Sequence, residues 1–256
     1  MNLLILLQRL CMWLLLASLL GLACGYWYRD RLPDPGFYDK RIAQDPRQTP
    51  TEHRPFTVQT GEQRYDIKPL YDYELDGMVV SMHHSDDWLD IYHHQDWGDF
   101  INIKDICVIW GDNVRSGVYR QMDFDNTTWT CWAYWPNGEV RRRFHDTQLS
   151  NNHLLTDRPD IQLAILAARP GDQIHLRGLL AEYANPANGF RRGTSTRRDD
   201  RGNGACETVY VQDFSVVRVA NPGWRRLFDI CLWLAPITGI AFLGLLLFTP
   251  VKRGLD

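Results

Sequence analysis

The stretch LCMWLLLASLLGLACGYWY, residues 10–28, contains no charged side chain, and neither does ICLWLAPITGIAFLGLLLFTPV, residues 230–251. A helix rises ~1.5 Å per residue and the hydrocarbon core of a bilayer is about 30 Å thick, so roughly 20 apolar residues cross it. Both stretches meet that length. They predict two transmembrane helices, one near each end of the chain, with a separate domain between them.

The first stretch has other interpretations that must be weighed. A cleaved secretory signal also starts with a basic residue and an apolar run, and a lipoprotein signal would end at Cys24. The stretch is long for a signal core, and aromatic residues follow it where a small-residue cleavage site would lie. The usual aliphatic residue three places before Cys24 is replaced by Gly21. We therefore interpret the stretch as an uncleaved signal anchor.

Two spans place both termini on one side of the membrane and the domain on the other. Basic residues near the spans barely distinguish the sides, with three on the terminal side and four on the domain side: Arg9, Lys252 and Arg253 against Arg29, Arg31, Arg225 and Arg226. The signal-like start favours an exported, periplasmic domain. The domain has three cysteines, Cys107, Cys131 and Cys206, so one disulfide leaves a thiol over, and the sequence leaves the pairing open.

The chain of 256 residues divides by composition. We expect a signal anchor over residues 1–28, a Pro-rich linker over 29–62, a β-rich domain over 63–222 and a C-terminal transmembrane helix over 227–251. The linker has five prolines, many charges and few aliphatic residues (Pro33, Pro35, Pro46, Pro50 and Pro55). Such a composition buries too little apolar surface to fold by itself.

The domain pattern is mainly strand-like. Alternating or continuous apolar runs predict strands over 65–70, 73–82, 106–110, 127–135, 173–180 and 208–219. Both faces of 127–135 carry aromatic residues, so this strand either is buried on two sides or lines a cleft, and we favour core packing. One helix is predicted after Asp157, a candidate cap, with Pro159 in its first turn and Ile161, Ile165 and Ala168 on one stripe. A second, short helix is expected over 86–94.

The stretch GDQIHLRGLL, residues 171–180, is similar to the turn-and-strand pattern of OB-fold-like barrels, and CETVYVQDFSVV, residues 206–217, looks like their closing strand. A small β domain between two spans resembles the GIDE-type membrane proteins. It also resembles bacterial two-span proteins of unassigned function with similar WGDN, SNNHL and RRDDRGNGACE stretches. The resemblance implies a small OB-like β-barrel with one or two short helices. It implies no catalytic residue, because GIDE-type ligases use a separate RING that this chain lacks.

The densest group of metal-ligand side chains lies over residues 82–94, which hold half of the eight histidines. His83, His84, Asp90 and His94 are the candidate ligands for Zn²⁺ or another divalent ion, since imidazole and carboxylate groups suit such ions. An open coordination position would permit hydrolysis. The spacing matches no established zinc signature, so a polar turn without a cofactor is the interpretation that we favour.

Two other polar stretches invite functional interpretations. Trp110-Gly111-Asp112-Asn113 follows an apolar strand and is typical of a tight turn, although Asp112 can also expose a carboxylate on a rim. Ser150-Asn151-Asn152-His153 precedes the predicted helix. A serine beside a histidine suggests nucleophilic catalysis, but no GxSxG elbow supports it, and we interpret the stretch as an ordinary loop.

The segment GFRRGTSTRRDDRGNGA, residues 189–205, contains five arginines and two aspartates. Its candidate contact residues are Arg191, Arg192, Arg197, Arg198 and Arg201. Guanidinium groups bind phosphate and carboxylate well, and few apolar side chains tie the segment to a core. A solvated loop is the default interpretation of such a segment, and contact with a partner or with anionic headgroups is the alternative. We predict a contact surface that is dispensable for folding, unless the arginines pair with Asp199, Asp200 or Glu207. The aspartates and the membrane setting argue against nucleic acid.

The sequence thus predicts an integral membrane protein whose β domain works by binding, without catalysis. The expected partners are the lipid bilayer and a membrane or envelope protein. The alternative is a membrane-bound, metal-dependent hydrolase that uses the His/Asp group of residues 83–94. No oligomeric state follows from the sequence.

Overall fold

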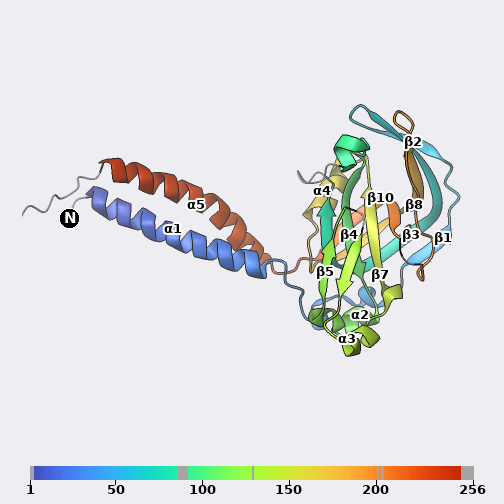
Figure 1. The fold of residues 1–256 in the computed structure, drawn as a ribbon, viewed down its shortest axis with the longest axis horizontal. Coiled ribbons are helices and arrows are strands. Elements are labelled where there is room, and N and C mark those ends of the chain that lie inside the picture. Colours follow the sequence, from blue (N-terminus) through green and yellow to red (C-terminus); the bar gives the residue numbers. More distant parts are fainter. Residues whose placement is uncertain (1–2, 86–91, 129, 201, 203–204, 249–256) are drawn as a thin grey trace, which may run out of the picture. The chain divides into compact units, whose positions relative to one another are not determined.

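Figure 1 shows the fold in the computed structural model, which describes residues 3–85, 92–128, 130–200, 202 and 205–248. The chain forms two compact units. One combines its two ends, Met1–Arg31 with Asn221–Asp256, and the other runs from Leu32 to Ala220. The first unit is helical, and the second contains the sheet.

The helical unit consists of α1 (Leu3–Tyr28) and α5 (Pro222–Phe248). Both helices are long and apolar enough to cross a membrane, judged by length and composition. This agrees with the expectation of one such helix near each end. Pro236 lies inside α5 without ending it, a position that membrane helices tolerate better than soluble ones.

Small residues bring α1 and α5 together. A Cβ atom at Gly25 would lie 2.8 Å from the Cβ of Phe228, and one at Gly21 would lie 2.5 Å from the Sγ of Cys231. Residues four apart share a helix face, so the two glycines form one contact stripe. Apolar helices associate in lipid through such stripes, where close backbone approach gives van der Waals packing.

Polar groups join the end of α1 to the start of α5. The side-chain amide of Asn221 donates to the carbonyl of Arg31 at 2.6 Å. Arg225 is buried although it is charged, and its Nε donates to the carbonyl of Arg29 at 3.2 Å. These carbonyls lie just beyond the end of α1, where backbone acceptors have no partner inside the helix. The two side chains supply that partner.

The second unit is built from strands and short helices. Its strands, among the described residues, are β1 (Arg47–Pro50), β2 (Phe56–Thr60), β3 (Gln63–His84), β4 (Asn102–Ile109), β5 (Asp123–Asn126), β6 (Cys131–Tyr134), β7 (Leu149–Leu155), β8 (Gln173–Asn185), β9 (Phe190–Arg192) and β10 (Glu207–Arg218). Its helices and helical turns are η1 (Pro35–Phe37), η2 (Lys40–Ala43), η3 (Tyr92–Asp96), α2 (Asp112–Arg115), η4 (Val118–Gln121), α3 (Gly138–Arg143), η5 (Asp146–Gln148) and α4 (Pro159–Ala167). About 35% of the chain is strand and 38% is helix, so the expected mainly β content does not describe the chain as a whole.

The strands form one large mixed sheet and a separate hairpin (Figure 1). The order in the sheet is β1-β3-β4-β7-β10-β8-β9, β2 pairs with β3, and β3 also pairs with β8. The sheet is mixed because β7 and β10 run parallel, with Val209 opposite Leu154, whereas the other pairs are antiparallel. The separate hairpin consists of β5 and β6.

The long strand β3 replaces two strands that the sequence indicated separately. It pairs with β4 on one side and β8 on the other, and its register shifts between Pro69 and Tyr71. A proline at a shift in register leaves no ladder hydrogen bond unmade. Glycines permit the close strand contacts. A Cβ atom at Gly178 would lie 2.3 Å from the carbonyl oxygen of Tyr210, and one at Gly77 would lie 2.2 Å from a methyl of Val108.

The Gly-Asp turn before β8 lies where the sequence predicts it. Gly171 has φ +88°, a conformation that favours glycine. The Asp172 carboxylate accepts the backbone N–H of Arg169 at 2.9 Å and that of Ala220 at 2.7 Å. One side chain therefore closes the turn and fixes the chain after β10.

The predicted helix is present as α4, with Ile161 and Ile165 buried. Its predicted cap is wrong. Arg158 precedes the first turn without a side-chain capping bond, and Asp157 instead accepts the hydroxyl of Tyr210 at 2.6 Å. A tertiary partner thus takes the carboxylate that the local pattern assigns to the helix.

A buried lysine closes the other end of α4. The Nζ of Lys104 donates to the carbonyl of Ala168 at 2.6 Å, and the side chain is fully buried. A cation at a helix C-terminus is favourable because the last carbonyls carry partial negative charge. Lys104 thereby fastens α4 to β4.

Residues 32–62 pack on the sheet, although their composition predicts a linker. Ile42 is buried, and the buried Tyr38 donates its hydroxyl to the carbonyl of Gly171 at 3.2 Å. Strand β1 pairs with β3, placing Gln48 opposite Tyr73. Two buried anchors and backbone pairing order a stretch that has too few aliphatic residues to fold by itself.

Candidate functional site

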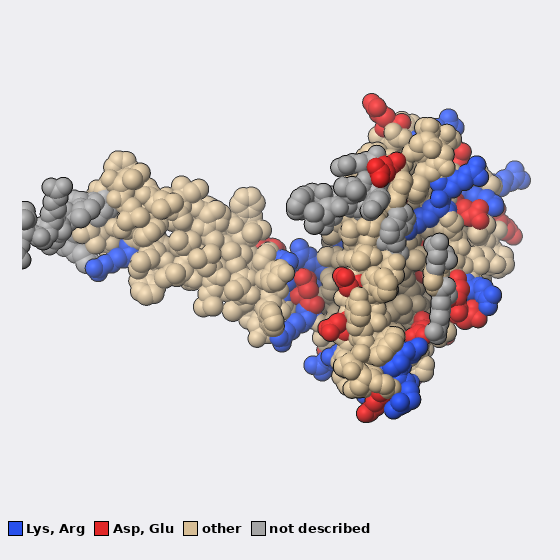
Figure 2. Space-filling view, viewed as in Figure 1, with Lys and Arg blue, Asp and Glu red and all other residues tan. Residues whose placement is uncertain are grey.

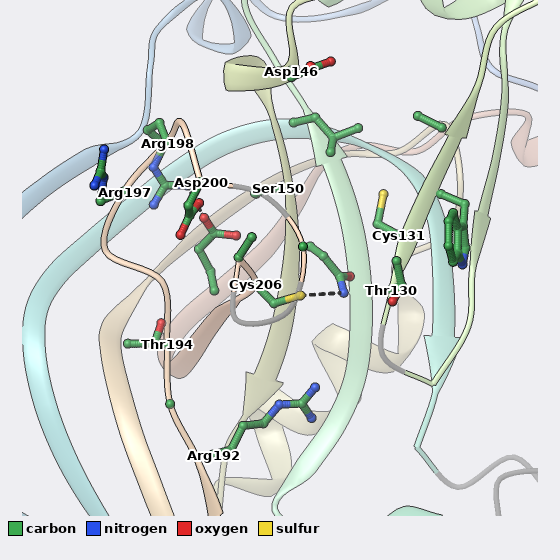
Figure 3. A pocket seen from close by; sticks show the side chains of 18 of the residues that line it. Thr130, Cys131, Asp146, Ser150, Arg192, Thr194, Arg197, Arg198, Asp200 and Cys206 are labelled. Atoms are coloured by element: carbon green, nitrogen blue, oxygen red, sulfur yellow. Dashed lines mark hydrogen bonds and ion pairs between the residues drawn. The ribbon is translucent and has the colours of Figure 1, made fainter.

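A pocket of about 840 Å³ opens between the β5–β6 hairpin and the Gly-Arg segment, residues 189–205. Figure 3 shows Arg197, Arg198, Asp200 and Cys206 on one side of it and Cys131 and Thr130 on the other. Its lining is partly apolar and partly charged: Trp132, Phe144 and Leu149 with Arg191, Arg192, Arg197, Arg198, Asp146, Asp200 and Glu207. We take this pocket as the candidate functional site.

Strand β7 forms the floor of the pocket. The stretch Ser150-Asn151-Asn152-His153, expected to be a loop, is part of this strand, and all four residues are buried. Buried polar groups must find hydrogen-bond partners. Asn151 accepts the amide of Asn126 at 3.1 Å and donates to the Cys206 sulfur at 3.5 Å. The stretch is therefore a polar floor and not a loop.

The hairpin forms one wall of the pocket. A single buried strand was expected over 127–135, but the structure has two short strands that turn between Asn126 and Cys131. Trp132 and Tyr134 are exposed, so the expectation of core packing fails for them. A disulfide joins Cys131 to Cys107 in β4 and fixes the hairpin to the sheet.

The Gly-Arg segment forms the other wall, and Arg198 fastens it. The guanidinium donates to Glu207 at 2.6 Å and to the side chain of Gln48 at 3.1 Å. It also lies 5.4 Å from the ring centre of the buried Tyr73. A planar guanidinium holds its donors in a fixed geometry that suits the two polar partners and the aromatic ring, which an ammonium group matches poorly.

Glu207 lies at the inner end of this wall. Burial raises the pKa of its carboxyl to about 7, against the opposing effect of Arg198. One carboxylate oxygen is paired with Arg198, and the other, Oε2, has no hydrogen-bond partner among the described residues although the side chain is only 3% exposed. A buried, singly paired carboxyl thus belongs to the lining of the pocket.

Beside the pocket, a carboxylate, an imidazole and a guanidinium form a buried chain. The Oδ1 atom of Asp105 lies 2.6 Å from the Nδ1 of His153, and Nη2 of Arg192 lies 2.8 Å from the Nε2 of His153. Asn102 donates to the same Asp105 oxygen at 3.0 Å. Asp105 and His153 are fully buried. This chain, the Asp105–His153–Arg192 relay, joins β4, β7 and β9.

The relay has a defined protonation state. Arginine can only donate, so the Nε2 of His153 must accept, and the ring proton is on Nδ1, facing Asp105. Burial lowers the pKa of His153, and the charge of Arg192 acts in the same direction. Although burial opposes ionisation of Asp105, its contact with His153 and the charge of Arg192 lower the pKa of its carboxyl. The relay therefore combines an ionised carboxylate, a neutral imidazole and a charged guanidinium.

The five predicted contact arginines do not share one environment. Arg191 and Arg197 are exposed, whereas Arg192 and Arg198 contact other residues inside the domain. Arg201 lies outside the described residues. Arg197 pairs on the surface with Asp199 at 2.9 Å. Among the described arginines, Arg191 and Arg197 are the ones placed to form the predicted contact surface, and Arg201 stays a prediction. The expectation that the segment is dispensable for folding does not extend to the two inner arginines.

The predicted metal group is described only in part. His83 and His84 end β3, His94 belongs to η3, and Asp90 lies outside the described residues. The ring of His94 stacks on Phe100 with centroids 4.6 Å apart. The metal site and the hydrolase that would use it remain predictions.

A different group of ligand-type side chains comes together. Glu74, Asp76 and His175 have ligand atoms that all lie within 4.8 Å of one another. Arg47 lies 3.3 Å from Glu74 and Arg41 lies 3.8 Å from Asp76. These arginines already supply positive charge to the carboxylates, so we interpret the group as a surface ion-pair cluster.

The stretch at 110–113 is structural. Gly111 has φ +62°, which fits the predicted tight turn. Asn113 is buried, and its side chain accepts the N–H of His145 and donates to the carbonyl of the same residue, each at 2.8 Å. Asp112 pairs with Arg115 at the surface. None of these residues lines the pocket.

Basic and acidic side chains are scattered among other residues over the visible face of the sheet unit, and the middle of the helical unit shows neither kind (Figure 2). The chain matches no family model, no curated protein and no solved structure.

We expect Arg198→Ser and Arg197→Ser to differ sharply in stability. Losing Arg198 leaves the buried Glu207 without its cation and should lower the free energy of unfolding by about 3 kcal/mol. Arg197, in an exposed pair, should cost less than about 1 kcal/mol. Urea unfolding of the full-length variants in detergent measures both. Equal, small losses would show that Arg198 is not a structural fastener.

Proposed function

We propose that residues 32–220 form an OB-like β-barrel domain that works by binding. The strand pairings support the barrel, because they run in a ring: β3 with β4, β4 with β7, β7 with β10, β10 with β8, and β8 again with β3. In chain order, the five strands of the ring are β3, β4, β7, β8 and β10. Four of the five pairs are antiparallel, and the parallel pair joins the third strand, β7, to the fifth, β10. Helix α4 lies between the third and fourth of these strands along the chain.

The position of the pocket supports binding. OB folds bind extended ligands on the face of their second and third strands, between the loop after the first strand and the loop before the last. In the proposed barrel these strands are β4 and β7. The pocket lies on β7 and is bordered by the segment before β10. This coincidence of pocket and binding face is the observation that carries the proposal.

The lining favours a ligand with both apolar and polar parts. Trp132 is 45% exposed at the hairpin wall and offers a flat apolar surface. Arg191 offers an exposed guanidinium, and Asp146 and Asp200 add carboxylates to the lining. A segment of a membrane or envelope protein has such a mixture. Nucleic acid fits less well, because acidic residues share the pocket with the arginines.

We also propose that α1 and α5 anchor the domain in a membrane and that the domain is exported. The length and composition of both helices support anchoring. The Cys107–Cys131 disulfide supports export, because disulfides persist in oxidising compartments such as the periplasm and are rare in the cytosol. The signal-like start of the chain points the same way.

The binding proposal predicts where a partner touches the domain. A photo-cross-linking amino acid at Trp132 or Arg191, introduced into the full-length protein in native membranes, should yield adducts of one defined mass. The same group at Leu163, which is 70% exposed on α4, is the matched control and should yield none. Adducts at Leu163 alone, or at all three positions equally, would contradict a binding site at the pocket.

The export proposal predicts the behaviour of a reporter fused after Asn221. Alkaline phosphatase at that point should be active in a bacterial host, because the enzyme needs disulfides that form outside the cytosol. A green fluorescent reporter at the same point serves as the control and should be dark. A bright fluorescent fusion with an inactive phosphatase would place the domain in the cytosol.

A further inference from the structure

Two of the three cysteines of the sheet unit line the pocket, and the third is bonded to one of them. Cys107 is buried and is bonded to Cys131, which lines the pocket from the hairpin. Cys206 lines the same pocket from the opposite wall and carries a thiol. A thiol and a disulfide thus face one cavity in a domain that has no other cysteine between residues 32 and 220.

The strand register brings these residues close together. Cys107 lies opposite Asn151 in the β4–β7 pair, and Glu207 lies opposite Asn152 in the β7–β10 pair. Cys206 directly precedes Glu207, so the same register places Cys206 opposite Asn151. Neighbouring strands are about 4.8 Å apart. Cys107, Asn151 and Cys206 therefore form one row across three strands, with the amide of Asn151 in the middle.

Hydrogen bonds connect the same row to the hairpin. Asn151 donates to the sulfur of Cys206 at 3.5 Å, drawn as the dashed line in Figure 3, and accepts from Asn126 at 3.1 Å. Asn126 is the cross-strand partner of Cys131. The side chain of Asn151 thus separates the thiol of Cys206 from the disulfide and is the group that must move before they touch.

We propose that Cys206 is the attacking thiol of an internal thiol–disulfide exchange site, in which it competes with Cys107 for Cys131. The thiol of Cys206 loses its proton, and the thiolate attacks the sulfur of Cys131. The Cys131–Cys206 bond forms, the Cys107–Cys131 bond breaks, and the sulfur of Cys107 leaves as a thiolate that takes up a proton. Two electrons move within the three sulfurs, so the step needs no external oxidant or reductant.

The difference in exposure favours Cys131 as the sulfur attacked. Cys131 is partly exposed in the pocket, whereas Cys107 is fully buried in β4.

Burial raises the pKa of the Cys206 thiol, while Asn151 and Arg192 act against this rise. Exchange should therefore be slow at neutral pH and accelerate as the pH rises, because the thiolate is the nucleophile.

The exchange has a structural consequence. The Cys107–Cys131 bond holds the hairpin on β4, but a Cys131–Cys206 bond would tie the hairpin to the opposite wall of the pocket. The two walls cannot then separate. The exchange would therefore set whether the pocket is open, and this inference does not rest on which partner the pocket binds.

Cysteine variants of the full-length protein in detergent test the proposal. In Cys107→Ser, the thiols of Cys131 and Cys206 should form a disulfide in glutathione disulfide buffer, as seen by peptide mapping after an acid quench. In the matched control Cys131→Ser, Cys107 and Cys206 should not pair, because Cys107 is fully buried in β4, two strands away from Cys206. Glutathione adducts on Cys131 and Cys206 of Cys107→Ser, without an internal bond, would overturn the proposal.

A second measurement avoids the risk that Cys107→Ser fails to fold. The chain with all its cysteines, held at pH 8.5 and then quenched, should contain a minor Cys131–Cys206 peptide. Asn151→Ala removes the side chain between thiol and disulfide and should raise that fraction several-fold. If neither protein contains the peptide at pH 8.5 while Cys206 reacts with maleimide, the proposed exchange does not occur.

Discussion

The buried contact between Asp105 and His153 is the constraint on which the candidate site depends. An ionised carboxylate is costly to bury unless charge and hydrogen bonds compensate it. Here the Nδ1 of His153 lies 2.6 Å from the Asp105 carboxylate, and the Nε2 of the same ring accepts from Arg192. Asn102 also donates a hydrogen bond to Asp105. Because Arg192 comes from β9, the cost of burying Asp105 is offset only when the start of the Gly-Arg segment lies against the sheet.

Two other contacts complete the arrangement. Arg198 holds the middle of the Gly-Arg segment on Glu207, and the Cys107–Cys131 disulfide holds the hairpin on β4. The pocket is the space left between these two fastened walls, over the polar strand β7. The chain thus uses charged and polar groups, more than apolar ones, to build its site. Such groups need specific partners, which gives the site a defined shape.

The sequence predicts the parts of this structure that depend on local pattern. The uncharged stretches predict α1 and α5, and the stripe of Ile161 and Ile165 predicts α4. Gly171-Asp172 predicts the turn before β8. The site depends on pairing between strands that are distant in sequence, so the local pattern predicts little of it. Residues 150–153 were expected to form a loop because asparagine and serine are rare in strands, and only pairing with β4 and β10 buries them. The pairing of Cys107 with Cys131 and the inward position of Arg198 likewise come from strands distant in sequence. Two stretches are dense in polar residues, one that ends at His153 and one that begins at Arg191. This density is the signal in the sequence that points to the site.

Amide hydrogen exchange of the full-length protein with His153→Ala tests the central role of the relay most directly. Losing the imidazole leaves Asp105 and Arg192 without the group that joins them. Exchange should then accelerate in peptides covering 189–192 and 205–210, while α1, which belongs to the helical unit, keeps its protection. Unchanged protection of residues 189–192 and 205–210 in the variant would contradict the account, because the segment would then be held without the relay.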